Sequence, residues 1–186
     1  MSKRAVIVVD LQKDYLAVGG LALVEIDEAV ANAAKVINVA RSAGDKVIHV
    51  RHENPANAQF FARGTDGAEI IPTVAPAKGE LVIIKQYPNA FRGTQLKHAL
   101  DAEGIKDVVI LGAMSHMCID ATSRAAADLG YNTTIVEDAC ATRDVEFNGK
   151  TVSAAQVHAA YMSALALAYG KVVTTRDLTS RDPNPA

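Results

Sequence analysis

The sequence has no tryptophan, only two cysteines and few aromatic residues, which make up 5% of the chain. No apolar run approaches the roughly 18–20 residues that a membrane-spanning helix needs. The first apolar run is also too short for the ~7–15-residue core of a signal peptide. A formal net charge of −2 gives no basic surface for nucleic acid or an anionic membrane. We therefore expect neither partner, and we expect a cytoplasmic protein, because two distant cysteines without a CxxC pair suit a reducing compartment.

The chain contains six short apolar runs rich in β-branched residues. Most are apolar at consecutive positions, which is typical of strands buried on both faces of a parallel sheet. With 186 residues, of which 49% are hydrophobic, the chain is long enough for one globular domain. We expect that domain to span residues 1–186, with a frayed tail over 180–186. The expected strands are Ala5–Val9, Lys46–Val50, Leu81–Lys85, Asp107–Gly112, Asn132–Asp138 and Lys171–Thr175.

Segments with helical periodicity separate these runs. The first is expected to be capped by Asp27 and to end at Gly44, and Ser153 with Gln156 forms a capping-box pattern at the start of the last. Regular alternation of strands and helices predicts an α/β fold, a doubly wound three-layer α/β/α sandwich. The exception is the segment Glu53–Gly79, whose Asn, Pro and Gly content predicts a binding loop that could hold a short helix.

Three polar side chains mark the carboxyl ends of the expected strands. Asp10 ends the first run, Lys85 ends the third, and the loop to Cys118 follows the fourth. Ligands of open α/β sheets bind outside the carboxyl ends of the strands. The sequence thus predicts an acid, a base and a thiol at the edge where chemistry is expected.

Each of these residues also has an ordinary structural interpretation. A free cysteine often fills core space, an aspartate can cap a helix, and a lysine can be a surface charge. The expected helix start at Cys118 favours function, because a helix N-terminus lowers the pKa of a thiol and offers N–H groups to an oxyanion. Cys140 has no comparable neighbours and is expected to be structural.

Other catalytic patterns are weak or missing. Ser115 and His116 are adjacent but lack the G-x-S-x-G context of a serine hydrolase. None of the five histidines falls in H-x-x-x-H or H-E-x-x-H, and no phosphate-binding glycine motif occurs. His52, just after the second expected strand, is the best-placed histidine. We expect no metal and no cofactor.

The motifs that contain these residues make the chain similar to the isochorismatase-like cysteine hydrolase family, a superfamily of isochorismatases, nicotinamidases and ureide amidases. The resemblance covers nearly the whole chain. The motifs occur in order as AVIVVDLQKDY (Ala5–Tyr15), KQYPNAFRGTQL (Lys85–Leu96), GAMSHMCIDATSRAAADLGY (Gly112–Tyr131) and VEDACAT (Val136–Thr142).

The resemblance implies a catalytic triad of Asp10, Lys85 and Cys118. It also implies a cis peptide between Ala113 and Met114, which turns backbone N–H groups of Met114 and Cys118 into an oxyanion hole. The implied six-stranded parallel sheet has the order 3-2-1-4-5-6. In that order Lys85 lies two strands from Asp10, roughly 9–10 Å away, so its side chain must reach across the intervening strand.

The chain departs from the family pattern at several positions. Ser115 stands where threonine is frequent, and His116 where Asp or Asn is frequent. Val50 and His52 stand where nicotinamidases have an Asp-x-His metal motif, so the histidine matches and the carboxylate is missing. A metal-dependent nicotinamidase is therefore disfavoured, and Cys118 favours amide or ureide hydrolysis over vinyl-ether cleavage.

The resulting hypothesis is hydrolysis of a C–N bond in a small-molecule amide or ureide through a thioester. Asp10 takes the thiol proton, Lys85 orients Asp10, and Cys118 attacks. The alternatives are an isochorismatase-type vinyl-ether hydrolase, a redox sensor and a silent scaffold. The family also implies a homo-oligomer, a dimer or a tetramer. The expected substrate-binding residues, which can equally be core or subunit contacts, are Tyr15, Phe60, Phe61, Tyr87, Phe91 and His116.

Overall fold

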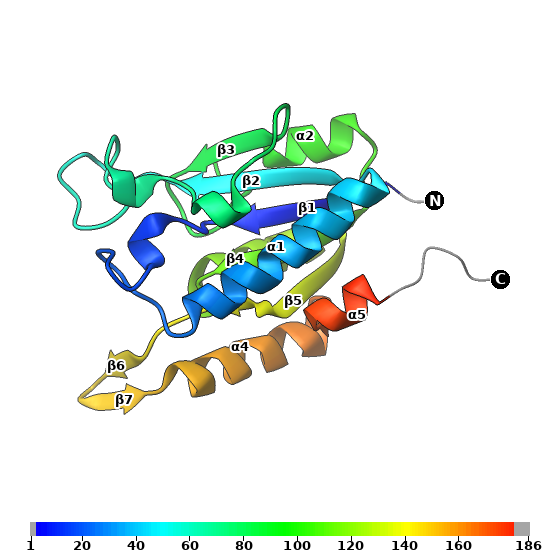
Figure 1. The fold of residues 1–186 in the computed structure, drawn as a ribbon. Coiled ribbons are helices and arrows are strands. Elements are labelled where there is room, and N and C mark those ends of the chain that lie inside the picture. The colour runs from blue at the N-terminus through cyan, green and yellow to red at the C-terminus, as the bar shows by residue number, and fades with distance from the viewer. Residues whose placement is uncertain (1–2, 181–186) are drawn as a thin grey trace.

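The computed structural model describes residues 3–180 and contains a six-stranded parallel sheet (Figure 1). The strand order is β3-β2-β1-β4-β5-β8, which confirms the predicted α/β class and the predicted spatial order. Residues 181–186, most of the tail for which fraying was expected, lie outside the described residues. The strands of the sheet are β1 (Arg4–Val9), β2 (Lys46–His52), β3 (Leu81–Lys85), β4 (Asp107–Ala113), β5 (Asn132–Ala141) and β8 (Lys171–Val173).

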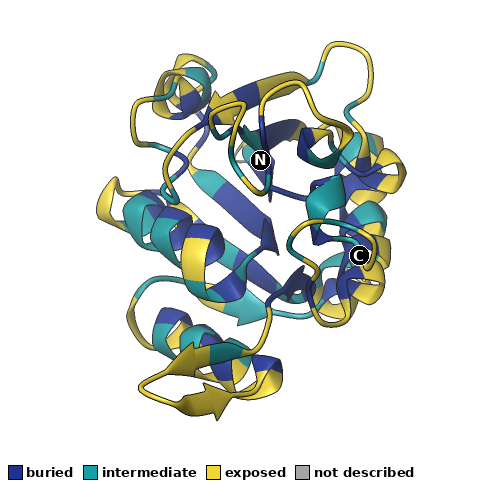
Figure 2. Cartoon of the chain, turned by 90° about the vertical axis from the view of Figure 1, so that its left-hand side faces the viewer, coloured by how far each residue is buried: buried dark blue, intermediate teal, exposed yellow. Residues whose placement is uncertain are grey.

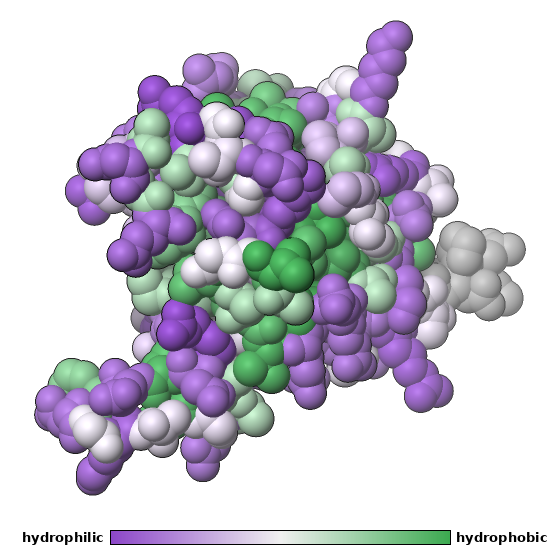
Figure 3. All heavy atoms as spheres, turned by 60° about the vertical axis from the view of Figure 1, so that its left-hand side comes forward, coloured by the Kyte–Doolittle hydropathy of each residue, from purple (hydrophilic) through white to green (hydrophobic). Residues whose placement is uncertain are grey.

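The sequence analysis missed a small hairpin, which lies between β5 and β8 along the sequence. It consists of β6 (Val145–Phe147) and β7 (Lys150–Val152), which pair antiparallel away from the main sheet. Strands of three residues are too short to show a period-2 pattern. The hairpin extends from the lower left of the molecule in Figure 1, and Figure 3 shows the same extension with a mostly hydrophilic surface.

Helices cover both faces of the sheet and make three layers. The alternation of β1 side chains shows the division: Val6 and Val8 pack with α1 (Ile26–Ala43), whereas Ala5 and Ile7 pack with helices on the other face. Two hydrophobic clusters therefore sandwich the sheet. Partly buried Leu178 of α5 (Thr175–Thr179) joins the α1 cluster, and the opposite face carries α2 (Leu96–Ala102), α3 (Asp120–Asp128) and α4 (Ala154–Ala168).

The helix boundaries test the capping predictions. Gly44 caps α1 in the left-handed conformation with φ of 74°, and Ser153 forms a capping box with Gln156; both predictions are confirmed. The prediction that Asp27 caps α1 is wrong, because the helix already begins at Ile26 and Asp27 lies in its first turn. There the exposed carboxylate still interacts favourably with the helix dipole.

The segment Glu53–Gly79 folds back onto the residues that follow β1. The buried Gln12 side chain donates to the carbonyls of His52, at 2.9 Å, and Ala68, at 2.7 Å, and accepts from the His52 N–H at 2.8 Å. The Phe61 N–H donates to Asp14 Oδ2 at 2.6 Å. These bonds hold the segment beside the carboxyl ends of β1 and β2. Its helical content is two short 3-10 turns, Asp66–Ala68 and Pro72–Val74.

Gly112 allows β1 and β4 to approach closely at their carboxyl ends. It pairs with Val9 in the sheet, at a register shift in the pairing of β4 with β5. A Cβ at position 112 would lie 1.9 Å from the carbonyl oxygen of Val9, and the φ of 127° favours glycine. This close approach brings Asp10, the next residue after Val9, beside the chain that leaves β4.

Candidate active site

The three residues at the expected strand ends lie buried at the carboxyl edge of the sheet, the edge that Figure 2 faces. Asp10 follows β1 directly, has a φ of 53°, and its N–H donates to the Val50 carbonyl at 2.9 Å. Lys85 is the last residue of β3. Cys118 lies in a π-helical turn, Ser115–Ile119, between β4 and α3. All three are at least nine-tenths buried.

Lys85 reaches across β2 to the centre of this group. Its Nζ lies 2.6 Å from Asp10 Oδ2 and 3.2 Å from Cys118 Sγ. The same nitrogen lies 2.9 Å from Nδ1 of His52, its partner in the β2–β3 register. The separation of two strands between Lys85 and Asp10 is thus bridged by the length of the lysine side chain.

The charges of these groups are set by burial and by one another. Burial lowers the pKa of Lys85, but the interactions with Asp10 and with the sulfur of Cys118 outweigh this effect, and the net pKa is raised. Burial also raises the pKa of Cys118, Asp10 raises it further, and Lys85 offsets only part of the increase. The lysine is therefore a cation, and the cysteine is a neutral thiol in the free protein.

At Cys118 burial raises the pKa of the thiol, whereas the sequence analysis expected a helix N-terminus to lower it. The α-helix begins only at Asp120, and Cys118 belongs to the π-helical turn that precedes it. Desolvation of the thiolate dominates at this buried position. Any reaction of this sulfur as a thiolate would therefore need a base to take the thiol proton.

Backbone and side-chain bonds define the shape of the turn around Cys118. The peptide between Ala113 and Met114 is cis. The Met114 carbonyl accepts from the N–H groups of Met117, at 3.0 Å, and Ile119, at 3.2 Å. Ser115 Oγ lies 2.8 Å from Nδ1 of His158 and 3.3 Å from the Ala141 carbonyl. Ser115 thus ties the turn to α4 and β5, a contact that spacing along the chain did not reveal.

Three of the six expected substrate-binding residues form one aromatic group next to this site. Tyr15 and Phe61 meet edge to face with ring centroids 4.8 Å apart, and Phe60 packs on Phe61 at 5.5 Å. The Phe61 ring also lies 5.9 Å from that of His52. Burial raises the pKa of Tyr15, and electrostatic interactions with Asp10 and Cys118 raise it further.

The other three lie in different contacts. Phe91 stacks on Tyr131 at 5.9 Å, in the core layer of α2 and α3. Tyr87 is exposed under the guanidinium of Arg92. His116 Nδ1 lies 2.7 Å from Thr142 Oγ1, and its ring meets Tyr161 of α4. All three residues lie within the sequence motifs, but each side chain turns toward a different neighbour.

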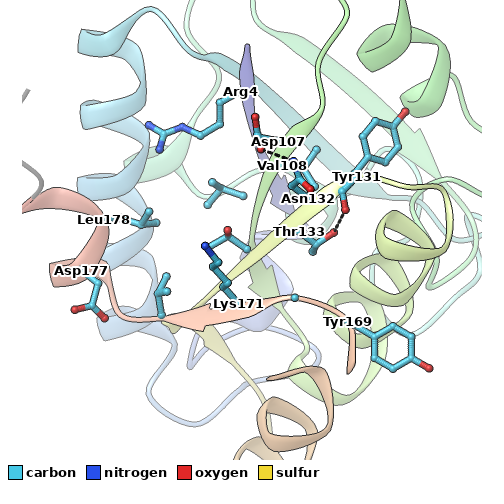
Figure 4. Close-up of a pocket in the computed structure, with 14 residues that line it drawn as sticks. Arg4, Asp107, Val108, Tyr131, Asn132, Thr133, Tyr169, Lys171, Asp177 and Leu178 are labelled. Atoms are coloured by element: carbon cyan, nitrogen blue, oxygen red, sulfur yellow. Dashed lines mark hydrogen bonds between the residues drawn. The ribbon is translucent and has the colours of Figure 1, made fainter. Parts of the chain in front are cut away.

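The large cavity in Figure 4 lies at the opposite edge of the sheet. It has a volume of about 710 Å³, and its lining includes Arg4, Asp107, Asn132 and Lys171, at the amino ends of β1, β4, β5 and β8. None of the three buried residues of the active-site candidate lines it. The carboxyl edge comes forward in Figure 3, where hydrophobic side chains gather between hydrophilic ones. Exposed apolar side chains on its loops include Val18 and Met117.

The site also contains a group of possible metal-binding atoms. One side-chain atom each of Asp10, His52 and Cys118 lies within 4.8 Å of the others. Lys85 Nζ, in contact with all three side chains, occupies the position between them. The lysine ammonium there supplies the positive charge that a bound metal ion would otherwise bring.

No helix among residues 3–180 is long and apolar enough to cross a membrane.

The fold and the position of the polar site are those of a doubly wound α/β protein with its functional site at the carboxyl edge of the sheet. The isochorismatase domain model matches residues 4–177, and the chain belongs to the isochorismatase family.

Similar proteins cover nearly the whole chain. The isochorismatase family protein YddQ of Bacillus subtilis is 45% identical over 92% of this chain and 96% of its own length. The crystal structure of an isochorismatase from Pseudomonas putida is 40% identical, with a TM-score of 0.89, over 94% of this chain and 89% of that one. Maleamate amidohydrolase of Pseudomonas putida is 30% identical over 94% of this chain and 84% of its own length. The relatives thus include hydrolases.

Proposed function

We propose that the protein is a cysteine-dependent hydrolase that cleaves a C–N bond in a small amide or ureide. The observation that carries this proposal is the contact of one buried ammonium, Lys85 Nζ, with both Asp10 and the sulfur of Cys118. A carboxylate, a cation and a thiol so close together, and shielded from water, provide a base, a charge balance and a nucleophile.

In the first step, Asp10 takes the proton of Cys118 as the sulfur attacks the carbonyl carbon. The negative charge moves to the carbonyl oxygen, which the backbone N–H groups of Met114 and Cys118 stabilise. Asp10 returns the proton to the leaving nitrogen as the C–N bond breaks. Ammonia or an amine departs, and the acyl group remains on sulfur as a thioester.

In the second step, Asp10 removes a proton from a water molecule, whose oxygen attacks the thioester carbonyl. The C–S bond breaks, the acid product leaves, and the sulfur recovers the proton from Asp10. Lys85 stays a cation throughout and balances whichever of Asp10 and Cys118 is negative. The raised pKa of Cys118 fits this order, because the thiol ionises only as it reacts.

The substrate class is tested by measuring ammonia release from a panel of small amides, N-carbamoyl compounds and linear ureides. We expect turnover of at least one member with kcat in the ordinary enzyme range of about 1–10³ s⁻¹. Isochorismate should give no pyruvate. Pyruvate release without any ammonia release would replace this proposal with the vinyl-ether hydrolase.

The redox-sensor alternative requires a thiolate that peroxide can trap. Cys118 is buried, and burial raises its pKa, so we expect slow oxidation by peroxide at neutral pH. Turnover of an amide would also separate the proposed enzyme from a silent scaffold.

We further propose that the chain forms a homo-oligomer, a dimer or a tetramer, in the cytoplasm. Two free cysteines fit a reducing compartment.

Helix α4 contains no charged side chain, yet Leu167 on its outer face is 87% exposed in the single chain. Most of the other exposed residues of α4 are alanines, and a contiguous exposed apolar face typically marks an interaction surface.

Light scattering after size-exclusion chromatography tests the assembly. We expect a mass of two or four chains, and a shift toward one chain in Leu167→Glu. The exposed position should tolerate glutamate with a stability change within about 0.5 kcal/mol. Leu129→Glu, at an exposed position outside α4, is the matched control. A monomeric wild type would contradict the proposal.

A further inference from the structure

We propose that His52 is a fourth functional member of the site, a positioning residue that accepts the third N–H of Lys85 and so aims the other two at Asp10 and Cys118. The inference rests on the proposed function and assigns a role to a histidine that the mechanism above does not use. It follows from one chain of hydrogen bonds, from the segment after β2 to the lysine.

The polarity of that chain is set at its outer end. The Asn54 side chain lies with Nδ2 3.0 Å from the carbonyl oxygen of Phe60, which can only accept. The amide nitrogen therefore donates there, and Asn54 Oδ1 is left as an acceptor. This oxygen lies 3.1 Å from Nε2 of His52, so Nε2 carries the proton.

The tautomer of His52 follows from this arrangement. With the proton on Nε2, a neutral imidazole has its lone pair on Nδ1. Nδ1 lies 2.9 Å from Lys85 Nζ, and an ammonium can only donate. The ring thus accepts from the lysine on one side while it donates to Asn54 on the other.

An ammonium has three N–H groups, and Lys85 has three partners in contact. Because Lys85 is buried, an N–H without a partner is costly. Without a hydrogen bond to His52 Nδ1, the ammonium could rotate, and its N–H groups would point less directly at Asp10 and at the sulfur of Cys118. His52 therefore fixes the orientation of the group that balances the reacting charges.

The position of the ring is itself well defined. The buried Gln12 side chain binds both the N–H and the carbonyl of His52, so the backbone is held independently of the imidazole. The Phe61 ring packs 5.9 Å away. A substitution at position 52 therefore removes the ring and leaves the bonds between Gln12 and the backbone in place.

The groups around the imidazole keep it neutral. Burial lowers the pKa of His52 and the charge of Lys85 lowers it further, while Asp10 and the bond to Asn54 oppose this, and the net pKa is lowered. The imidazole is thus neutral at pH 7. As the pH falls through this lowered pKa, Nδ1 gains a proton, the acceptor is lost and a second cation faces Lys85. Activity should fall with it.

The test compares His52→Asn and His52→Leu with wild type. Asparagine Oδ1 can take the place of Nδ1 as an acceptor, whereas leucine cannot accept. His98→Asn, on an exposed face of α2, is the matched control. We expect His52→Leu to lower kcat on an identified amide by about 10²-fold, the effect of a misdirected catalytic group. His52→Asn should recover most of the activity and lose the acidic limb that His52 protonation causes in the kcat–pH profile.

A second measurement does not depend on turnover. Nitrogen-15 NMR of histidine-labelled wild type, with the His52 signal assigned by its loss in His52→Asn, should show a proton on Nε2 and none on Nδ1. The ring should titrate below the reference pKa of ~6.5. A proton on Nδ1, or equal loss of activity in the Asn and Leu variants with an unchanged acidic limb, would overturn the positioning role. Failure of the hydrolase proposal would appear as missing turnover in wild type, with the tautomer unaffected.

Discussion

Replacing Cys118 with alanine is expected to abolish hydrolysis of whichever amide the wild type accepts. No other nucleophile in the proposed mechanism can form the acyl intermediate, and removing a catalytic nucleophile costs up to ~10⁶-fold in kcat. We expect a loss of at least roughly 10³-fold. The measurement is ammonia release, with unfolding curves recorded beside it to show that the variant is folded.

The other cysteine provides the matched control. Cys140 lies in the hydrophobic cluster on the α2 side of the sheet, where it pairs with Gly112 of β4. Cys140→Ala should therefore reduce stability slightly and leave turnover largely intact. If Cys140→Ala were inactive and Cys118→Ala active, Cys118 would not be the nucleophile. Acid-quenched wild type should also carry the acyl group on the peptide that contains Cys118.

Replacing Lys85 with methionine should affect both stability and turnover. Asp10 and Lys85 form an ion pair in which both side chains are fully buried, and removing one partner leaves an uncompensated charge. Breaking a buried pair in this way typically costs about 3–5 kcal/mol. We expect a loss of that size in the free energy of unfolding at pH 7, together with loss of amide hydrolysis, measured by urea titration and ammonia release.

A double variant separates the two effects. In Asp10→Asn with Lys85→Met no unpaired charge remains, and neutral replacements of buried ion pairs are often neutral or stabilising. The double variant should therefore recover most of the lost stability while it remains inactive. If Lys85→Met were as stable as wild type, the buried pair would not carry the expected charges. If the double variant hydrolysed amides, Asp10 would not be the base.

The sequence predicted the sheet because its strands are buried on both faces. Continuous apolar runs such as Ala5–Val9 and Asp107–Gly112 correspond to β1 and β4 within one residue at each end. The β6–β7 hairpin was missed because its strands have three residues each and are mostly exposed. The last run was predicted too long, since Thr174 leaves the strand to cap α5.

The candidate site was only partly visible in the sequence. Strand ends and motifs indicated Asp10, Lys85 and Cys118, since parallel strands bring their carboxyl ends to one edge. Tyr15 and Phe61 also lie in this region, whereas Phe91 and His116 turn to other neighbours. The direction of a side chain depends on packing partners from distant segments, and spacing along the chain carries no information about them.

The sequence by itself thus determined the α/β architecture, the family and the three residues at the strand ends, because local patterns of burial and short motifs encode them. Only the tertiary structure decided the reach of Lys85 across β2, the contacts of the His52 ring and the burial that raises the pKa of Cys118. The physical reason is that these properties arise between segments. They depend on which acceptors meet one ammonium, and on how completely the fold removes a thiol from water.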